Sequence, residues 1–100
     1  MIHTKNELIQ LLHLNASVIK SYGVDKLFIF GSFKHDKAKE QSDVDFLVDF
    51  MPQKKTYNNL FYLYSFLEEK TGRKVEVLTR AGLSKHIGPH ILNDLENVTL

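Results

Sequence analysis

The alternation of apolar and polar residues along the chain divides it into short β-prone runs and longer stretches with helical spacing. Strands are expected at Leu27–Phe30, Val44–Phe50 and Arg73–Thr79, and helices from Thr4 to Gly23, at Tyr57–Lys70 and at Ser84–Glu96. Thr4 and Glu7 form a capping box at the start of the first helix, and Gly23 ends it. Gly88-Pro89 is expected to kink the last helix or delay its start.

The lengths of the connections predict how the strands pair. The link between the first two strands is short for a parallel crossover, which usually needs a dozen or more residues, so these strands are expected to be antiparallel. The strand–helix–strand unit from Val44 to Thr79 is expected to be a right-handed crossover with parallel strands. The sequence therefore predicts an α/β (α+β) fold: a three-stranded mixed sheet with helices packed on one side, in one domain over residues 1–100.

Two aspartates stand at the start of the second predicted strand. Because side chains alternate along a strand, Asp43 and Asp45 share one face, about 7 Å apart along the strand, and Val44 and Phe46 share the other. Two carboxylates at this spacing repel each other and contribute nothing to a core. The spacing is typical of residues that hold divalent cations, although two solvated residues at a strand end would look the same.

A small turn, Gly31-Ser32, directly follows the first predicted strand. Glycine lets a phosphate approach the backbone closely, and such a turn presents N–H groups to it. Antiparallel pairing places this turn beside Asp43 and Asp45. Carboxylates beside a phosphate-binding turn indicate a metal–nucleotide site, and an ordinary strand-to-helix turn is the alternative. No Gly-Lys-Ser/Thr follows at the required spacing, so the turn is not a P-loop.

At these residues the chain resembles the nucleotidyltransferase superfamily with the DNA polymerase β-type palm. More narrowly it resembles the minimal nucleotidyltransferases, the MntA-like antitoxin partners of HEPN toxins. That family carries Gly-Ser, ten residues and then Asp-x-Asp, and here ten residues separate Gly31-Ser32 from Asp43-Val-Asp45. The family places a third carboxylate in a Lys-Val-Asp-Val-Val-Thr-like stretch on the next strand. The corresponding stretch here reads Lys-Val-Glu-Val-Leu-Thr, which puts Glu76 in that place.

The resemblance implies the transfer of a nucleoside monophosphate, AMP from ATP, to a hydroxyl group. The resemblance assigns Gly31 and Ser32 to the β- and γ-phosphates, and Lys34 and Ser42 are further candidates for binding the nucleotide. The residues that it assigns to catalysis and to two Mg²⁺ ions are Asp43, Asp45 and Glu76. Mg²⁺ prefers carboxylates, water and phosphate oxygens, which fits this set. Glu76 is also compatible with an ordinary exposed strand residue.

The sequence departs from the family pattern at two places. The third carboxylate is usually Asp, and Glu76 is one methylene longer. The family often has Arg-Gly soon after Gly-Ser, where this chain has Lys34-His35-Asp36. Both departures concern the efficiency of catalysis more than the fold or the metal site. Lys34 and His35 are near enough to Ser32 to meet a triphosphate, or they belong to a solvated, lysine-rich loop.

Composition excludes several classes of protein. The net charge is +1, from 13 basic and 12 acidic residues, so no general attraction to nucleic acid or membrane is expected. The chain has no cysteine, which removes disulfides and thiolate chemistry and is compatible with a cytoplasmic location. No apolar run approaches the roughly 20 residues needed to span a bilayer. A cytoplasmic protein without direct nucleic-acid or membrane partners is therefore expected.

No acceptor for the nucleotide is evident in the sequence. A chain of this length has no room for a second domain that would bind an antibiotic, tRNA or primer. The family resemblance implies that a tyrosine of a separate HEPN-type toxin receives AMP and that the toxin is thereby silenced. Two alternatives are a binding module that neutralises its partner by contact, with weak catalysis, and a lone transferase that acts on a small hydroxyl compound.

The helix predicted at Tyr57–Lys70 carries aromatic residues on two faces. Its expected core stripe consists of Leu60, Leu63, Tyr64 and Leu67. Tyr62 and Phe66 fall on nearly the opposite side, one turn apart. An exposed aromatic pair of this kind stabilises a helix by only about 0.2–0.5 kcal/mol, which is too little to account for two aromatic residues facing water. These residues are expected to contact the toxin or a second copy in a homo-oligomer, unless a terminal segment, Val98 to Leu100, covers them.

Overall fold

The computed structural model describes all residues from Met1 to Leu100. Its elements follow one another as α1 (Lys5–Leu14), α2 (Ala16–Ser21), β1 (Val24–Phe30), α3 (Gly31–Lys34), β2 (Val44–Phe50), α4 (Tyr57–Thr71), β3 (Val75–Leu78), the 3-10 helix η1 (Arg80–Gly82), α5 (Gly88–Asp94) and β4 (Glu96–Val98). None of the helices is long and apolar enough to cross a lipid bilayer.

The strands form one mixed sheet in the order β3-β2-β1-β4. β1 and β2 are antiparallel, and β2 and β3 are parallel, which confirms both pairings predicted from the connection lengths. The prediction of three strands is wrong. Glu96–Val98 leaves the last helix and pairs antiparallel with Leu27 to Ile29, which satisfies the outer edge of β1 and buries Val98 in the core.

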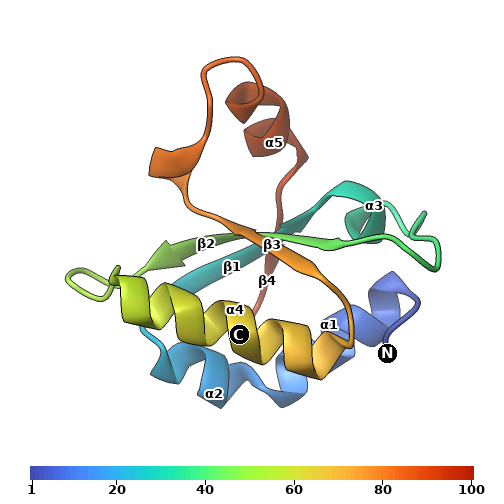
Figure 1. The fold of residues 1–100 in the computed structure, drawn as a ribbon, viewed down its shortest axis with the longest axis horizontal. Helices are drawn as coiled ribbons and strands as arrows, with labels where there is room; N and C mark the ends of the chain where they lie inside the picture. The colour runs from blue at the N-terminus through green and yellow to red at the C-terminus, as the bar shows by residue number, and fades with distance from the viewer.

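The main core lies on one face of the sheet. Figure 1 shows α1, α2 and α4 packed below the sheet, whereas η1 and α5 rise above it. Strand alternation explains the core face, because inward positions of β1 and β2 are fully buried and apolar. Its largest fully buried side chains include Leu8, Leu12, Ile19, Leu27, Ile29, Phe46, Leu63 and Leu67. The expectation that helices pack on one side therefore holds for the long helices and fails for α5.

The first and last predicted helices are both interrupted. The capping box of Thr4 and Glu7 is present, but α1 ends at Asn15, whose side-chain amide donates a hydrogen bond to the carbonyl of Leu11. A second helix, α2, then continues towards Gly23. The last helix begins only at Gly88, with the proline in its first turn, which confirms the expected delay. Ile87 lies within the helix expected at Ser84–Glu96, but it precedes the observed helix and is 61% exposed.

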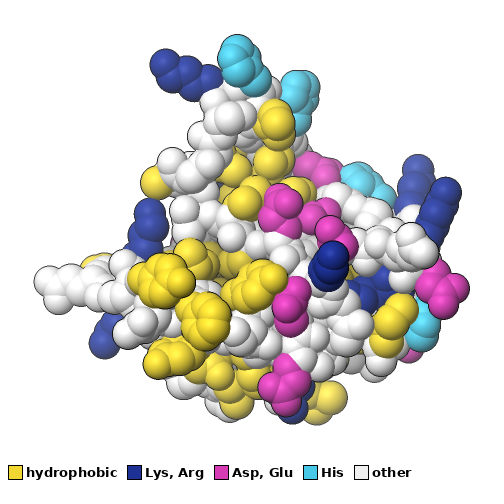
Figure 2. Space-filling model, in the orientation of Figure 1, with side chains coloured by type: hydrophobic (Ala, Val, Ile, Leu, Met, Phe, Trp, Pro, Cys, Tyr) yellow, Lys and Arg dark blue, Asp and Glu magenta, His cyan; other side chains and the backbone are white.

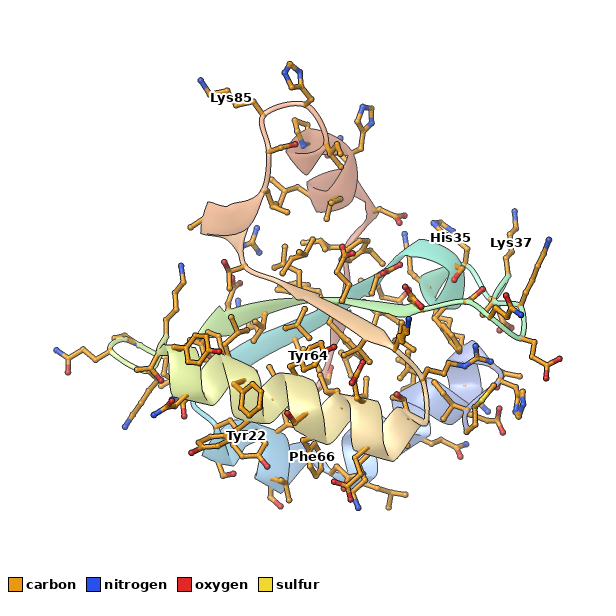
Figure 3. The ribbon with its side chains drawn as sticks, in the orientation of Figure 1. Tyr22, His35, Lys37, Tyr64, Phe66 and Lys85 are labelled. Atoms are coloured by element: carbon orange, nitrogen blue, oxygen red, sulfur yellow. The ribbon has the colours of Figure 1, made fainter.

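Two aromatic residues of α4, Tyr62 and Phe66, contact the end of α2. Tyr22 follows α2 and packs on Tyr62 and Phe66, with ring centroids 6.2 and 5.9 Å apart. Figure 3 shows Tyr22 and Phe66 together beneath α4. Phe66 is half-buried against the core, whereas Tyr62 remains exposed, and Tyr64 of the expected core stripe is exposed as well. The prediction that these aromatics contact a partner stays a prediction.

Candidate active site

The predicted carboxylates lie on the sheet face opposite the main core. Along β2, Val44, Phe46 and Val48 point into the core, so Asp45 points to the other face. The strand register places Asp45 directly beside Glu76 of β3. Asp43 immediately precedes β2 and belongs to the same alternation. Two neighbouring strands thus bring together the three acids that the sequence singled out. Figure 2, which looks at the edge of the sheet, shows several acidic side chains near the middle of the view.

These acids have no cationic partner in the chain. Other acids of the protein are paired: Asp49 with Arg80 at 3.0 Å, Asp94 with Lys34 at 3.0 Å and Glu96 with Lys5 at 2.8 Å. Partial burial is the largest cause that raises the pKa of Asp45 to about 6, and the charges of Glu76 and Asp43 contribute to the same shift. A cluster of negative charge that the chain does not neutralise is the environment expected around a bound cation.

The donor set fits Mg²⁺ in its chemistry, since all three groups are carboxylates. Their side chains do not converge on one point, and no three acidic or histidine side chains are placed to hold an ion together. Asp43 and Glu76 are exposed, so their carboxylates are free to change rotamer. Asp43, Asp45 and Glu76 would therefore have to reorient around an ion.

Gly31 lies against Asp45 at the end of β1. Phe30 pairs with Asp45 across the sheet, and Gly31 follows with a left-handed backbone, φ 74°. A Cβ atom at this position would collide with Oδ2 of Asp45. Glycine is required here both for the backbone conformation and for the space that the carboxylate occupies. The predicted phosphate turn and the predicted metal carboxylate are therefore in direct contact.

Replacing Gly31 by alanine is expected to lower the free energy of unfolding by about 2 kcal/mol, because a left-handed conformation is strained for alanine. The added methyl should also push the Asp45 carboxylate aside. Gly82→Ala is the matched control, since its Cβ would meet only Thr79 Oγ1 at 3.6 Å, an ordinary contact. Urea unfolding of both variants tests this. Equal effects of the two substitutions would contradict the assigned role of Gly31.

The other predicted nucleotide-binding residues are held differently. Lys34 Nζ donates a hydrogen bond to Asp94 Oδ1 at 3.0 Å. Ser42 Oγ accepts one from the backbone N–H of Lys39 at 2.8 Å, which closes the turn before Asp43. Ser32 is half-buried at the start of α3. Ser32 and Lys34 thus lie in or next to the Gly31-Ser32 turn. The hydroxyl of Ser42 is instead hydrogen-bonded within its own loop.

The Lys34-His35-Asp36 stretch ends in a tight turn. Asp36 takes a left-handed conformation with φ 54°, which aspartate tolerates better than most residues with a side chain. Its carboxylate accepts the backbone N–H of Lys5 at the start of α1, at 3.0 Å. The turn after α3 therefore keeps a glycine-like backbone without glycine.

Asp94 was not identified from the sequence, and it contacts the Gly31-Ser32 turn. Its Oδ2 accepts the backbone N–H of Gly31 at 3.0 Å, and its Oδ1 accepts Lys34 Nζ at 3.0 Å and lies 2.7 Å from His35 Nε2. The Gly31 N–H is the largest cause that lowers the pKa of Asp94 to about 2, with Lys34 and His35 adding to it. No local signal marks this residue, because its partners are some 60 positions away in the chain.

Arg73 was also not identified from the sequence. It is 7% exposed, and its Nη1 donates to the carbonyls of Lys39, Glu40 and Ser42 at 3.0, 3.1 and 2.9 Å. Its Nε donates to the carbonyl of Ile2 at 2.7 Å, and its guanidinium stacks 5.0 Å from the ring of Phe33. Arg73 thus fixes the loop that leads directly into Asp43.

Comparisons with known proteins agree with this geometry. The family described as polymerase beta, nucleotidyltransferase, matches residues 6–98. A candidate protein adenylyltransferase of Methanocaldococcus jannaschii is 36% identical over 81 residues, which cover 81% of this chain and 86% of that protein. The protein adenylyltransferase MntA of Thermococcus cleftensis is 32% identical over 74 residues, 74% of each chain.

Two solved structures share the fold. A candidate minimal nucleotidyltransferase superimposes with a TM-score of 0.79 at 25% identity, over 93% of this chain and 94% of that one. A toxin-antitoxin crystal structure with AMP-PNP superimposes with a TM-score of 0.64 at 17% identity, over 95% of this chain and 72% of that one. At 17% identity the second likeness concerns the fold alone.

Proposed function

Since this chain belongs to the polymerase β nucleotidyltransferase family, we propose that it transfers AMP from ATP to a hydroxyl group of a partner protein. The observation that carries the proposal is the pairing of Asp45 with Glu76 beside the Gly31 turn, on a sheet face outside the main core. Carboxylates without a cationic partner next to a glycine turn suit a nucleotide with its metal better than they suit a stable core.

The residues of the chain have separate roles in this proposal. Gly31, Ser32 and Lys34 bind the β- and γ-phosphates through a backbone N–H, a hydroxyl and an ammonium group. Asp43, Asp45 and Glu76 would hold Mg²⁺. Bound Mg²⁺ would supply positive charge that neutralises phosphate oxygens and lowers the pKa of the attacking hydroxyl.

The chemical step is a displacement at the α-phosphorus of ATP. A bond forms between the acceptor's oxygen and the α-phosphorus, and the bond from that phosphorus to the bridging oxygen of the β-phosphate breaks. Pyrophosphate leaves, and the proton of the acceptor's hydroxyl passes to solvent. The chain supplies orientation and charge for this step, through the phosphate turn on one side and the carboxylates on the other.

The proposed acceptor is a tyrosine of a HEPN-type toxin, which makes the protein an antitoxin. The names of the relatives support a protein acceptor, because they describe protein adenylyltransferases. The toxin-antitoxin structure with AMP-PNP supports both a toxin partner and an adenine nucleotide. A second candidate function is neutralisation of the toxin by contact with little catalysis. The engagement of Gly31 and Lys34 by Asp94 favours that candidate.

Binding of ATP with Mg²⁺ is expected to raise the melting temperature of the protein. A ligand that binds only the folded state stabilises it by about 2.7 kcal/mol at a hundredfold excess over its Kd. The shift should be much smaller for ATP in EDTA, because the triphosphate then meets uncompensated carboxylates. Thermal unfolding in the two buffers measures this difference. If ATP raises the melting temperature equally with Mg²⁺ and with EDTA, the metal ion is not part of the proposed site.

Transfer itself is tested with ATP labelled at the α-phosphate, mixed with this protein and the product of the neighbouring gene. Label on a tyrosine of the partner supports the enzyme that acts as an antitoxin. A tight complex without label supports neutralisation by contact. Label on a small hydroxyl compound in the absence of any partner would contradict a protein acceptor.

A further inference from the structure

Three donors of the phosphate turn converge on one carboxylate. The backbone N–H of Gly31, the ammonium of Lys34 and the imidazole of His35 all lie within 3.0 Å of the carboxylate oxygens of Asp94. Both oxygens are used, since Oδ2 accepts from Gly31 while Oδ1 faces Lys34 and His35. Figure 3 shows His35 at the end of α3.

This constellation suits a phosphate as well as it suits a carboxylate. A backbone amide N–H, a lysine ammonium and an imidazole N–H are donors that bind phosphate oxygens in proteins. Gly31 and Lys34 are also the groups that the proposed function assigns to the β- and γ-phosphates. The amide hydrogen of Gly31 is already donated to Asp94. A phosphate that uses this N–H must therefore take the place of the carboxylate.

The segment that carries Asp94 is weakly held. In α5 only Gly88 is buried, Leu92 is 42% exposed, and the preceding Ile87 is exposed as well. Figure 1 shows α5 standing away from the sheet at the top of the molecule. The chain is anchored again directly afterwards, where β4 pairs with β1 and Val98 enters the core. Few apolar contacts oppose a local movement of α5, which is typical of segments that open at low cost.

We propose that Asp94 competes with the nucleotide for the phosphate turn, so that α5 must withdraw this carboxylate from Gly31, Lys34 and His35 before the β- and γ-phosphates bind. This inference rests on the proposed function, because it takes the phosphates to be those of ATP. A triphosphate carries more charge and more acceptor oxygens than one carboxylate, and it displaces Asp94 at sufficient concentration. The affinity for ATP is reduced by the fraction of molecules in which Asp94 occupies the turn.

Asp94→Asn is expected to lower the Kd of Mg-ATP about tenfold, as follows if Asp94 occupies the turn in about nine-tenths of the molecules. Glu96→Gln is the matched control. It removes the same charge two residues away, from a carboxylate that pairs with Lys5 outside the turn. Generic attraction of a less acidic protein for ATP would affect both variants alike, whereas competition affects only Asp94→Asn. AMP, which lacks the β- and γ-phosphates, should bind the wild type and Asp94→Asn equally.

Isothermal titration of ATP and AMP into the three proteins separates the outcomes. If the wild type binds ATP clearly and Asp94→Asn binds it equally well or more weakly, Asp94 does not compete with the nucleotide. Asp94 would then be a residue that positions the turn. Failure of every protein to bind Mg-ATP overturns the proposed function together with this inference.

A second measurement uses the wild type alone and does not depend on the folding of a variant. Hydrogen exchange followed by NMR should show faster exchange in residues 88–94 when Mg-ATP is added, while residues 96–98 remain protected in β4. A positioning role predicts the opposite, since a bound nucleotide would then add to the contacts of α5. Slower exchange in residues 88–94 would overturn the competition.

Discussion

Asp43→Asn and Asp45→Asn are each expected to reduce nucleotidyl transfer by several orders of magnitude while the protein remains folded. Each substitution removes a negative charge that would hold Mg²⁺, and without the ion the triphosphate and the acceptor lose their common source of positive charge. Asp49→Asn is the matched control, because Asp49 lies on the same face of β2 but pairs with Arg80. Transfer of label from ATP, with circular dichroism as the test of folding, measures the effect. Comparable loss in Asp49→Asn would contradict a specific role for the pair.

Asp45→Asn should also stabilise the protein in EDTA at neutral pH. The folded state raises the pKa of Asp45 from 3.8 to about 6, so it favours the protonated carboxyl. This contribution to stability is complete below pH 3.8 and is lost as the pH rises through 6. The free energy of unfolding of the wild type should fall across this window by on the order of 2 kcal/mol. The free energy of unfolding of Asp45→Asn should not fall across this window, so this variant should be more stable than the wild type at pH 7. A less stable variant would show that the Asp45 carboxylate has a structural role.

Arg73→Met is expected to lower the free energy of unfolding by about 3 kcal/mol or more. The substitution removes the guanidinium donors from the carbonyls of Ile2, Lys39, Glu40 and Ser42, of which only that of Lys39 keeps another partner, the backbone N–H of Ser42 at 3.1 Å. Each lost bond to a charged group costs about 1.5–3 kcal/mol before the structure relaxes. A domain of this size has only about 5–15 kcal/mol in total.

Arg80→Met is the matched control for Arg73. Its side chain is 49% exposed and pairs with Asp49, and an exposed pair is worth at most about 1 kcal/mol. Urea unfolding of both variants gives the comparison. If both substitutions lower the free energy of unfolding equally, the hydrogen bonds from Arg73 to the carbonyl cluster contribute no more stability than an exposed ion pair. A larger loss for Arg73→Met should be accompanied by weaker binding of Mg-ATP, because the loop before Asp43 loses its anchor.

The part of the fold that could be predicted depends on local pattern. β2 was predicted from Val44 to Phe50, and the pairing of β1, β2 and β3 followed from the lengths of two connections. β4 was missed because the apolar spacing of Ile87, Ile91 and Leu95 is helical. The competing influence, the unpaired edge of β1, exists only once the sheet has formed.

The residues of the candidate site also fall into those that could be predicted from the sequence and those that could not. Asp43 and Asp45 were placed on one face by a spacing of two residues, and Glu76 entered through the resemblance to a family. Asp94 and Arg73 could not be found in this manner, since their hydrogen bonds join positions that are 31 to 71 residues apart. Side chains that act across such separations leave no periodic trace in a sequence.

The placement of the carboxylates opposite the main core has an evolutionary consequence. Substitutions of Asp43, Asp45 or Glu76 leave the apolar face of the sheet intact, and loss of Asp45 removes a source of repulsion. Selection for folding alone would therefore let these acids drift away, and selection for chemistry must retain them. A lineage that came to neutralise its partner purely by contact would be recognised by the loss of these acids from an otherwise unchanged domain.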